Sequence, residues 1–150
     1  MGAVTVRGAT PADLGALLVL YEELADKAAA APGTREHSEP VLAEILADPA
    51  RHLVVALLDQ QPVGSADLIV APNLTHDGMP WAIVENVIVA EAARRKGVAR
   101  ELMAHLIDLA RAAGCYKVQL LSGMQREEAH RLYDSLGFAA VAQGFKLYLE

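Results

Sequence analysis

The sequence predicts one α+β domain over residues 1–150, with a mixed, mostly antiparallel central sheet of about six to seven strands flanked by about four helices. Segments with strand-like and helix-like spacing follow one another in the order β-α-α-β-β-β-α-β-α-β-β. Three successive strand patterns indicate a meander, and the strand–helix–strand order after it indicates a helical crossover. No repeat, linker or low-complexity tract interrupts the chain.

The amino-terminal part is predicted to form one strand and two helices. Val4–Arg7 has a short strand pattern. A capping hydroxyl at Thr10, a proline after it and an acid at Asp13 are typical of a helix start. Ser38 is expected to cap the second helix, and Asp48, which precedes a proline, to end it.

The central part is predicted to form the meander. His52–Leu58 and Val63–Val70 are apolar runs joined by Asp59–Pro62, which favours a hairpin turn. Ala71–Pro80 is rich in proline, asparagine, aspartate and glycine and is therefore expected to be a loop. Trp81–Ala90 is the clearest strand of the chain.

Strict alternation in that strand would divide its side chains between two faces. Glu85 then shares a face with Ile83, Val87 and Val89, while Asn86 points the other way with Ala82, Val84 and Ile88. Glu85 is the single carboxylate of an otherwise apolar face, so we expect it to be buried.

The carboxy-terminal part is predicted to contain two helices and three strands. A helix begins at Val98 and ends at Gly114, and a strand follows at Tyr116–Leu121. The last helix is expected from about Gln125 to Gly137. Phe138–Val141 and Phe145–Leu149 are expected to be a closing pair of strands.

Composition excludes several classes of protein. The net charge of −6 argues against binding nucleic acid. The sequence contains no run of 18 apolar residues, so we expect no membrane span. The first residues do not have the pattern of a signal peptide. Cys115 is the one cysteine and has no partner for an internal disulfide, which favours a reducing, cytoplasmic location. We read Cys115 as a small core residue, with a nucleophilic role as the open alternative.

A basic run stands where a helix begins. Arg94, Arg95 and Lys96 precede Gly97, and the helix pattern follows at once. Cations at the positive end of a helix are placed unfavourably unless an anion lies between them, and a helix start offers unpaired N–H groups to a phosphate. Solvated surface charge is the plainer interpretation. The motifs of P-loop and dinucleotide-binding proteins are absent.

The segment from Arg94 to Ala99 resembles the [Q/R]-x-x-G-x-[G/A] signature of the GNAT superfamily of N-acetyltransferases. Glu85–Val89 is similar to the family's fourth strand, and Ala129–Phe138 to its A-x-x-x-Y-x-x-x-G-F final helix. The order of elements matches across essentially the whole chain. A GNAT-like fold and acetyl-CoA as co-substrate are what this resemblance implies.

The resemblance also implies roles for individual residues. Glu85 would be the general base and Tyr133 the acid that protonates the leaving thiolate; core positions without a catalytic role are the alternatives. A bulge in the strand would free an amide near Val89 to polarise the thioester carbonyl. Arg126 stands where many relatives have an asparagine. The coenzyme-binding residues would be Val87, Ile88, Val89, Arg94, Arg95, Lys96, Gly97, Val98, Ala99 and Arg100, with Arg126 reaching a phosphate in place of the asparagine.

The acceptor site is expected at the first two helices and nearby strand ends. Its candidates are Tyr21, His37, Asn73, His76 and Trp81, although Tyr21 also fits a core position and the two histidines fit exposed loops. His130 is an alternative base or a surface residue. Histidine spacing predicts no metal site.

The function that follows is acetyl transfer from acetyl-CoA to an amine of a small molecule or peptide, by direct attack in a ternary complex. A non-catalytic acyl-CoA-binding or regulatory module of the same fold is the alternative. A homodimer formed through Phe138–Leu149 is a further expectation from the family.

Overall fold

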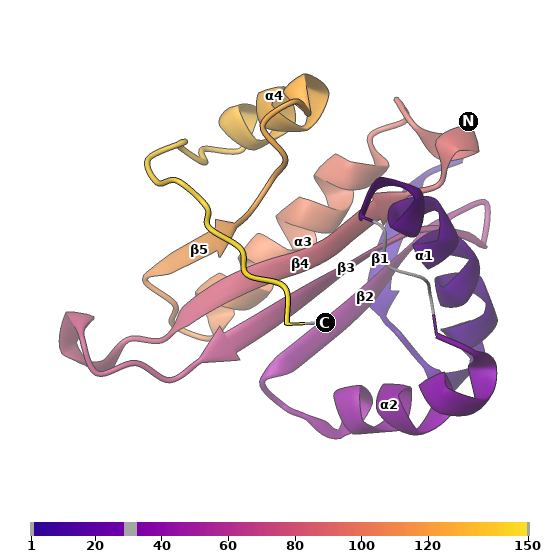
Figure 1. Ribbon diagram of the computed structural model, residues 1–150, viewed down its shortest axis with the longest axis horizontal. Helices are drawn as coiled ribbons and strands as arrows, with labels where there is room; N and C mark the ends of the chain where they lie inside the picture. Colours follow the sequence, from indigo (N-terminus) through magenta and orange to yellow (C-terminus); the bar gives the residue numbers. More distant parts are fainter. Residues whose placement is uncertain (1, 29–32, 150) are drawn as a thin grey trace. The chain divides into compact units, whose positions relative to one another are not determined.

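The computed structural model describes residues 2–28 and 33–149, the side chains of 25–28 excepted (Figure 1). The chain forms two compact units, Met1–Gln119 and Leu120–Glu150. Among the described helices, none is long and apolar enough to cross a membrane.

A five-stranded sheet forms the centre of the first unit (Figure 1). The strands lie in their order along the chain, and the first four pair in an antiparallel manner. β5 follows a helical crossover, the connection that parallel neighbours require. The strands are β1 (Val4–Gly8), β2 (Arg51–Leu58), β3 (Gln61–Ala71), β4 (Trp81–Val89) and β5 (Lys117–Leu120).

Four α-helices are present in the described residues, as expected. α1 (Leu14–Ala28), α2 (Arg35–Ala47) and α3 (Val98–Ala112) belong to the first unit, and α4 (Glu127–Ser135) belongs to the second. Three short 3₁₀ turns accompany them: η1 (Pro11–Asp13), η2 (His76–Gly78) and η3 (Glu91–Ala93).

Helices cover both faces of the sheet. Leu14 and Leu17 of α1 pack with Leu42 of α2 against Leu53 and Val55 of β2. α3 packs on the opposite face, where side chains of even-numbered β3 residues would point. Gly64 lies there, and a Cβ on it would come within 3.1 Å of Val98 and 3.2 Å of Leu102. A glycine at this position therefore lets α3 approach the strand closely.

The hairpin between β2 and β3 has a two-residue turn. Asp59 and Gln60 have φ of 50° and 65°, and Leu58 pairs with Gln61. This left-handed pair is the geometry whose twist matches antiparallel strands. The predicted four-residue turn is therefore too long, because Pro62 already pairs with Leu57 in the ladder.

The start of α2 differs from the prediction. Thr34, not Ser38, is the capping residue, and its hydroxyl accepts a bond from the His37 N–H at 3.4 Å. Ser38 is already helical, since its N–H donates to the Thr34 carbonyl at 2.9 Å. Both residue types are favourable helix caps. Thr34 is the one that caps α2, because the helix begins at Arg35 and the Thr34 hydroxyl reaches the N–H of its first turn. The predicted end at Asp48 is confirmed.

The expected count of six to seven strands is wrong. The sheet has five strands, and residues 138–149 form none, although Phe138–Val141 and Phe145–Leu149 were expected to pair. Residues 139–149 are all exposed. An alternating sequence gives a segment strand propensity, but a strand forms only where another strand supplies hydrogen bonds. Within the second unit no described strand is available to these residues.

Candidate active site

β4 contains a bulge at the centre of the predicted site. Asp67 of β3 pairs with Glu85, but Ser65, two residues earlier, pairs with Ile88, three residues later. The extra residue lies at Asn86, whose φ is 52°. Such a bulge bends the strand and takes backbone groups out of the ladder. These are the groups that an extended ligand beside β4 would use.

The bulge also changes which side chains share a face. Residues paired directly across an antiparallel ladder point to the same side of the sheet. Glu85 and Ile88 face the same side, because their partners Asp67 and Ser65 are two residues apart on one strand. The strict alternation expected for this strand is therefore wrong beyond Glu85, because the bulge adds one residue.

Glu85 is exposed, so the expectation that it is buried is also wrong. Its neighbour across the ladder, Asp67, is only 2% exposed. The α1 side of the sheet is thus covered over β3 and open at Glu85. Alternation could show which residues share a face, but it could not show where the covering helices end.

A partly buried ion pair beside Glu85 was missed by sequence reasoning. Arg51 Nε donates to Asp67 Oδ1 at 2.9 Å, and a second guanidinium nitrogen donates to Oδ2 at 2.5 Å. Tyr21 lies nearby: burial raises its pKa, and its interaction with Ser65 lowers it. The signal was present, since Asp67 is a lone acid inside the apolar run Val63–Val70.

The connection from β4 to α3 has the geometry of an anion site. Arg95 and Gly97 both have left-handed backbones, with φ of 65° and 81°. The first intrahelical bond of α3 runs from the Glu101 N–H to the Gly97 carbonyl at 3.1 Å. The N–H groups of Val98 and Ala99 come before that bond and have no intrahelical acceptor. Successive N–H groups in such a turn form a concavity that suits anions.

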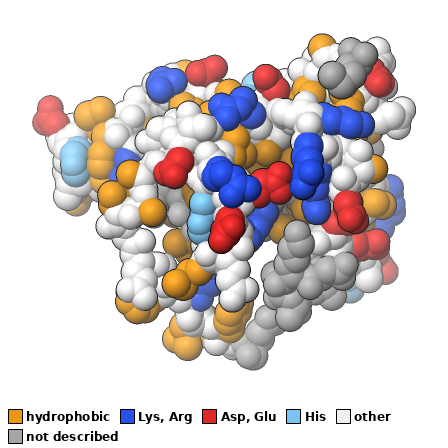
Figure 2. All heavy atoms as spheres, turned by 90° about the horizontal axis from the view of Figure 1, so that it is seen from above, with side chains coloured by type: hydrophobic (Ala, Val, Ile, Leu, Met, Phe, Trp, Pro, Cys, Tyr) orange, Lys and Arg blue, Asp and Glu red, His pale blue; other side chains and the backbone are white. Residues whose placement is uncertain are grey.

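Side chains of this connection add positive charge around those N–H groups. Arg94, Arg95, Lys96 and Arg100 are exposed, and Arg94 Nε donates to the Val89 carbonyl at 3.3 Å. Figure 2 shows Lys and Arg side chains interleaved with Asp and Glu on one face of the protein. The basic connection is therefore a local feature of a protein whose net charge is −6.

The second unit contains Tyr133 and Arg126, and a helix-ending motif fixes Tyr133. The Phe138 N–H donates to the Tyr133 carbonyl at 3.0 Å, and the Gly137 N–H donates to the Asp134 carbonyl at 3.0 Å. Gly137 is left-handed, with φ of 94°. This is a Schellman ending, which glycine alone adopts easily.

The hydrophobic contact that accompanies such an ending is between the two rings. Tyr133 and Phe138 meet edge to face, with centroids 5.8 Å apart. The sequence Tyr-x-x-x-Gly-Phe thus has a physical reason, because each part of it holds the tyrosine. Partial burial raises the pKa of Tyr133, and the charge of Arg126 opposes this.

The acceptor candidates differ in how far their side chains are buried and in the residues that they contact. Tyr21 packs on the core of α1, α2 and β2, and Trp81 at the start of β4 is half-buried. His37 is not in a loop as expected but in the first turn of α2, where its Nδ1 lies 2.9 Å from the Thr34 hydroxyl.

The other two candidates stabilise the β3–β4 loop itself. The Asn73 amide donates to the Thr75 and Met79 carbonyls at 3.0 and 3.1 Å. His76 stacks on Tyr116, with ring centroids 3.7 Å apart.

Cys115 and His130, the alternative nucleophile and the alternative base, have surroundings that the structure describes. Cys115 is half-buried, and burial raises the pKa of its thiol, which disfavours the thiolate. His130 Nε2 lies 2.8 Å from the Gly123 carbonyl. In the described part of the chain, no group of three or more His, Cys, Asp or Glu side chains is placed to hold a metal ion.

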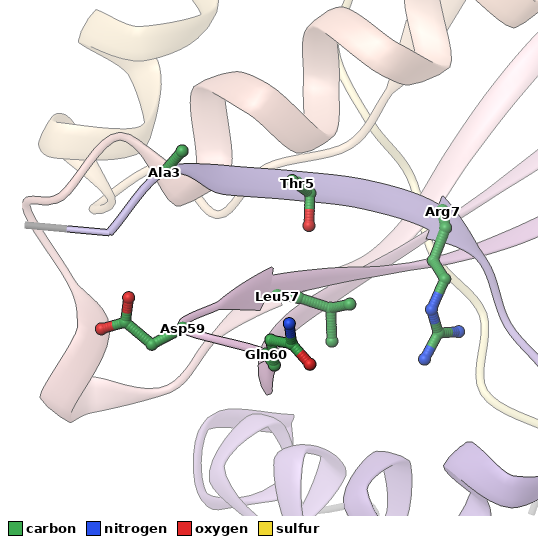
Figure 3. Close-up of a pocket in the computed structure, with 6 residues that line it drawn as sticks. All are labelled: Ala3, Thr5, Arg7, Leu57, Asp59 and Gln60. Atoms are coloured by element: carbon green, nitrogen blue, oxygen red, sulfur yellow. The ribbon is translucent and has the colours of Figure 1, made fainter.

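Two cavities lie in the first unit, and Arg51 of the ion pair lines the second of them. One, of about 530 Å³, lies along β1 and the β2–β3 turn, where Thr5, Arg7, Leu57 and Gln60 line it (Figure 3). The Arg7 guanidinium beside it is held by Asp13 at 2.7 Å. The other, of about 220 Å³, includes His52 and His105 in its lining. Neither cavity is lined by a residue of the predicted site.

Comparison with known proteins identifies the family. The model of the acetyltransferase (GNAT) family matches residues 18–138 and so spans both units. A glucosamine 6-phosphate N-acetyltransferase of Trypanosoma brucei brucei is 36% identical over 87 residues, which are 58% of this chain and 57% of that enzyme. This chain therefore covers little more than half of that enzyme's length.

Two solved structures match over nearly the whole chain. A protein of Agrobacterium tumefaciens, named provisionally as an acetyltransferase, is 38% identical, with a TM-score of 0.88, over 96% of this chain and 99% of its own. A transcriptional regulator of Bacillus halodurans is 31% identical, with a TM-score of 0.88, over 98% of this chain and 100% of its own. With its bulged β4, its basic connection and these matches, the chain belongs to the GNAT family of acetyltransferases.

Proposed function

We propose that this protein transfers the acetyl group of acetyl-CoA to a primary amine by direct attack in a ternary complex. The carrying observation is the bulged end of β4, which runs directly into a connection with three cations and into a helix start whose Val98 and Ala99 N–H groups have no intrahelical acceptor. A diphosphate fits that connection, and an extended arm fits the backbone of Val87, Ile88 and Val89 as an added strand.

Backbone groups would orient the thioester, which supplies the acyl group. The bulge at Asn86 removes N–H groups from pairing with β3. An amide near Val89 can then donate to the thioester carbonyl and stabilise the negative charge that develops on it. This donor is fixed by the strand, so little reorganisation is needed during the reaction.

Glu85 would take the proton from the acceptor. A primary amine with a pKa of about 10.4 arrives protonated at neutral pH and must lose a proton before it can attack. Since Glu85 is exposed, an amine or an intervening water can reach its carboxylate. Tyr133 would protonate the departing thiolate, and its raised pKa keeps the phenol protonated for that step.

The acceptor that we favour is an amine on a small molecule, and an amino sugar is the first to try. The Trypanosoma relative is named for glucosamine 6-phosphate.

We also propose that the two units form one domain, because the family match runs across their boundary. Phe145, Leu147 and Leu149 are each at least 85% exposed, and burial of this apolar segment would favour a homodimer.

Two measurements test the function. Calorimetric titration should show that CoA and acetyl-CoA bind, with competition between them. Thiol release from acetyl-CoA should then be followed with glucosamine 6-phosphate, an aminoglycoside, a polyamine, free amino acids and a lysine peptide. Absence of any heat with either nucleotide would refute the proposal.

A regulatory module that binds acyl-CoA without turnover is the second candidate. The Bacillus halodurans structure, named as a transcriptional regulator, has the same fold. Binding of CoA with no thiol release for any amine, and no loss of binding in Glu85→Gln and Tyr133→Phe, would favour this candidate.

A further inference from the structure

One side chain of α1 reaches the connection that follows β4. Glu23 Oε1 accepts a hydrogen bond from the Glu91 N–H at 2.9 Å, between residues 68 positions apart in the sequence. Glu91 is the first residue of η3, so its N–H has no acceptor within that turn. A carboxylate that accepts from a backbone N–H forms one of the stronger hydrogen bonds in proteins.

The contact fixes the start of the phosphate-binding connection. β4 ends at Val89, η3 begins at Glu91, and the left-handed residues Arg95 and Gly97 follow. Arg94 holds the middle of the connection through the Val89 carbonyl, and α3 holds its end. Glu23 links this connection to α1, a helix that comes 68 positions earlier in the sequence.

The charge of Glu23 has the wrong sign for an electrostatic role. A carboxylate close to a site for a diphosphate repels the ligand, so charge alone would favour a neutral or basic residue. What Glu23 adds is an acceptor at a defined position. The value of such a contact lies in holding the N–H groups of the connection where phosphate oxygens need them.

We propose that Glu23 is a positioning residue for acetyl-CoA and acts through the Glu91 amide on the phosphate-binding connection. The inference rests on the proposed function. It also links that connection to the helix that carries the acceptor candidate Tyr21, two residues earlier.

Three variants test the inference. Glu23→Ala removes the acceptor and the charge, and Glu23→Gln removes the charge but keeps an oxygen that can accept. Glu22→Ala is the matched control, because Glu22 is the adjacent glutamate of α1 and is exposed. We expect Glu23→Ala to raise the Kd and KM for acetyl-CoA by about 3- to 10-fold, with kcat within about twofold of wild type. Glu22→Ala should resemble wild type, and Glu23→Gln, whose neutral oxygen accepts a weaker bond, should fall between wild type and Glu23→Ala.

An electrostatic role gives the opposite result. In that case both Glu23 variants would bind acetyl-CoA more tightly than wild type, which would overturn the inference. So would equal affinity of Glu23→Ala and Glu22→Ala. Amide exchange in residues 90–97 should be faster in Glu23→Ala than in Glu22→Ala, and equal rates would also overturn it.

The proposed function and this inference fail in different ways. If the wild-type protein binds no CoA, the proposed function fails and the inference fails with it. If wild type binds CoA and Glu23→Ala binds it equally well, the inference alone fails.

Discussion

The two connections at the ends of β4 both contain left-handed residues, yet they differ in what their backbones do. In the β3–β4 loop, His76, Asp77 and Gly78 have φ of 52°, 57° and 78°. In the β4–α3 connection, Arg95 and Gly97 have φ of 65° and 81°. Backbone in this region is costly for residues other than glycine, and such cost is often found at functional sites.

The difference lies in the hydrogen bonds. The β3–β4 loop bonds to itself, through the Asn73 amide and through the Gly78 N–H, which donates to the Thr75 carbonyl at 3.1 Å. The β4–α3 connection also bonds to itself, since the Arg94 N–H donates to the Glu91 carbonyl at 3.3 Å, but it ends in the first N–H groups of α3, with cations around them. Unusual backbone geometry alone therefore does not distinguish the proposed coenzyme site from the β3–β4 loop; the helix-start N–H groups without an intrahelical acceptor, and the cations around them, do.

A substitution in β4, the strand between the two connections, should cause the largest loss of activity. We expect Glu85→Gln to lower kcat by about 100-fold or more, because loss of a general base typically costs this much, while CoA affinity stays unchanged. Steady-state kinetics and calorimetry measure the two quantities. Asp77→Asn, at an exposed acid of the β3–β4 loop, is the control and should behave as wild type. An unchanged kcat in Glu85→Gln would remove Glu85 from the mechanism.

Two glycines allow a matched test of the comparison. Gly97 and Gly78 both have positive φ, and nothing lies within 4 Å of a Cβ added to either. Alanine at each position should cost about 1–2 kcal/mol of backbone strain. Only Gly97→Ala should weaken CoA binding, by about 10-fold, because only that backbone is proposed to contact the ligand.

Calorimetry with CoA and urea unfolding of both variants give the two quantities. Equal losses of CoA affinity in the two variants would break the comparison, since the β3–β4 loop would then matter as much as the connection.

The self-bonded loop should respond in stability. Asn73→Ala removes an amide that donates to Thr75 and Met79, so the free energy of unfolding should fall by about 1–2 kcal/mol. Urea unfolding measures this, and Leu74→Ala, at a side chain that is 99% exposed, is the control. If Asn73→Ala instead left stability intact and raised KM for the acceptor, the residue would belong to the substrate site.

The β1–α1 connection is a third connection that bonds to itself. A substitution there should cause the smallest loss of stability, and this loss should depend on pH. The Arg7 guanidinium holds the pKa of Asp13 below its ordinary value, and the Thr10 N–H donates to the same carboxylate at 2.7 Å. A lowered folded-state pKa gives stability that is present above the unfolded value and lost as pH falls through the folded one.

Asp13→Asn should therefore destabilise the protein by about 1 kcal/mol at pH 7, and the difference from wild type should narrow below about pH 4. Urea unfolding at several pH values checks this. A difference that is constant down to pH 2 would mean that the charge of Asp13 contributes nothing.

Local patterns predicted most of the helices and strands. The end of α2 at Asp48, the strand near Val4 and the start of α3 after Gly97 are all where the sequence places them. The two helix boundaries depend on a proline or a glycine acting on its own neighbours, and the strand depends on its local residue pattern. The cap of α2 was misplaced because two hydroxyls, at Thr34 and Ser38, compete within one turn.

Long-range features were predicted less well. The exposure of Glu85 depends on where α1 and α2 end, and the Arg51–Asp67 pair depends on the register of β2 with β3. The closing strands were expected from the local residue pattern, but the structure gives residues 138–149 no strand partner. Sequence spacing contains no direct information on any of these pairings.

The sequence by itself determined the family, the position of the basic connection and the motif around Tyr133, because these depend on residues close together in the chain. Only the tertiary structure decided the bulge at Asn86, the exposure of Glu85 and the contact from Glu23 to Glu91. A bulge is defined by a partner strand, exposure by covering helices, and that contact by two segments 68 residues apart. Such relations exist only once distant parts of the chain have packed together.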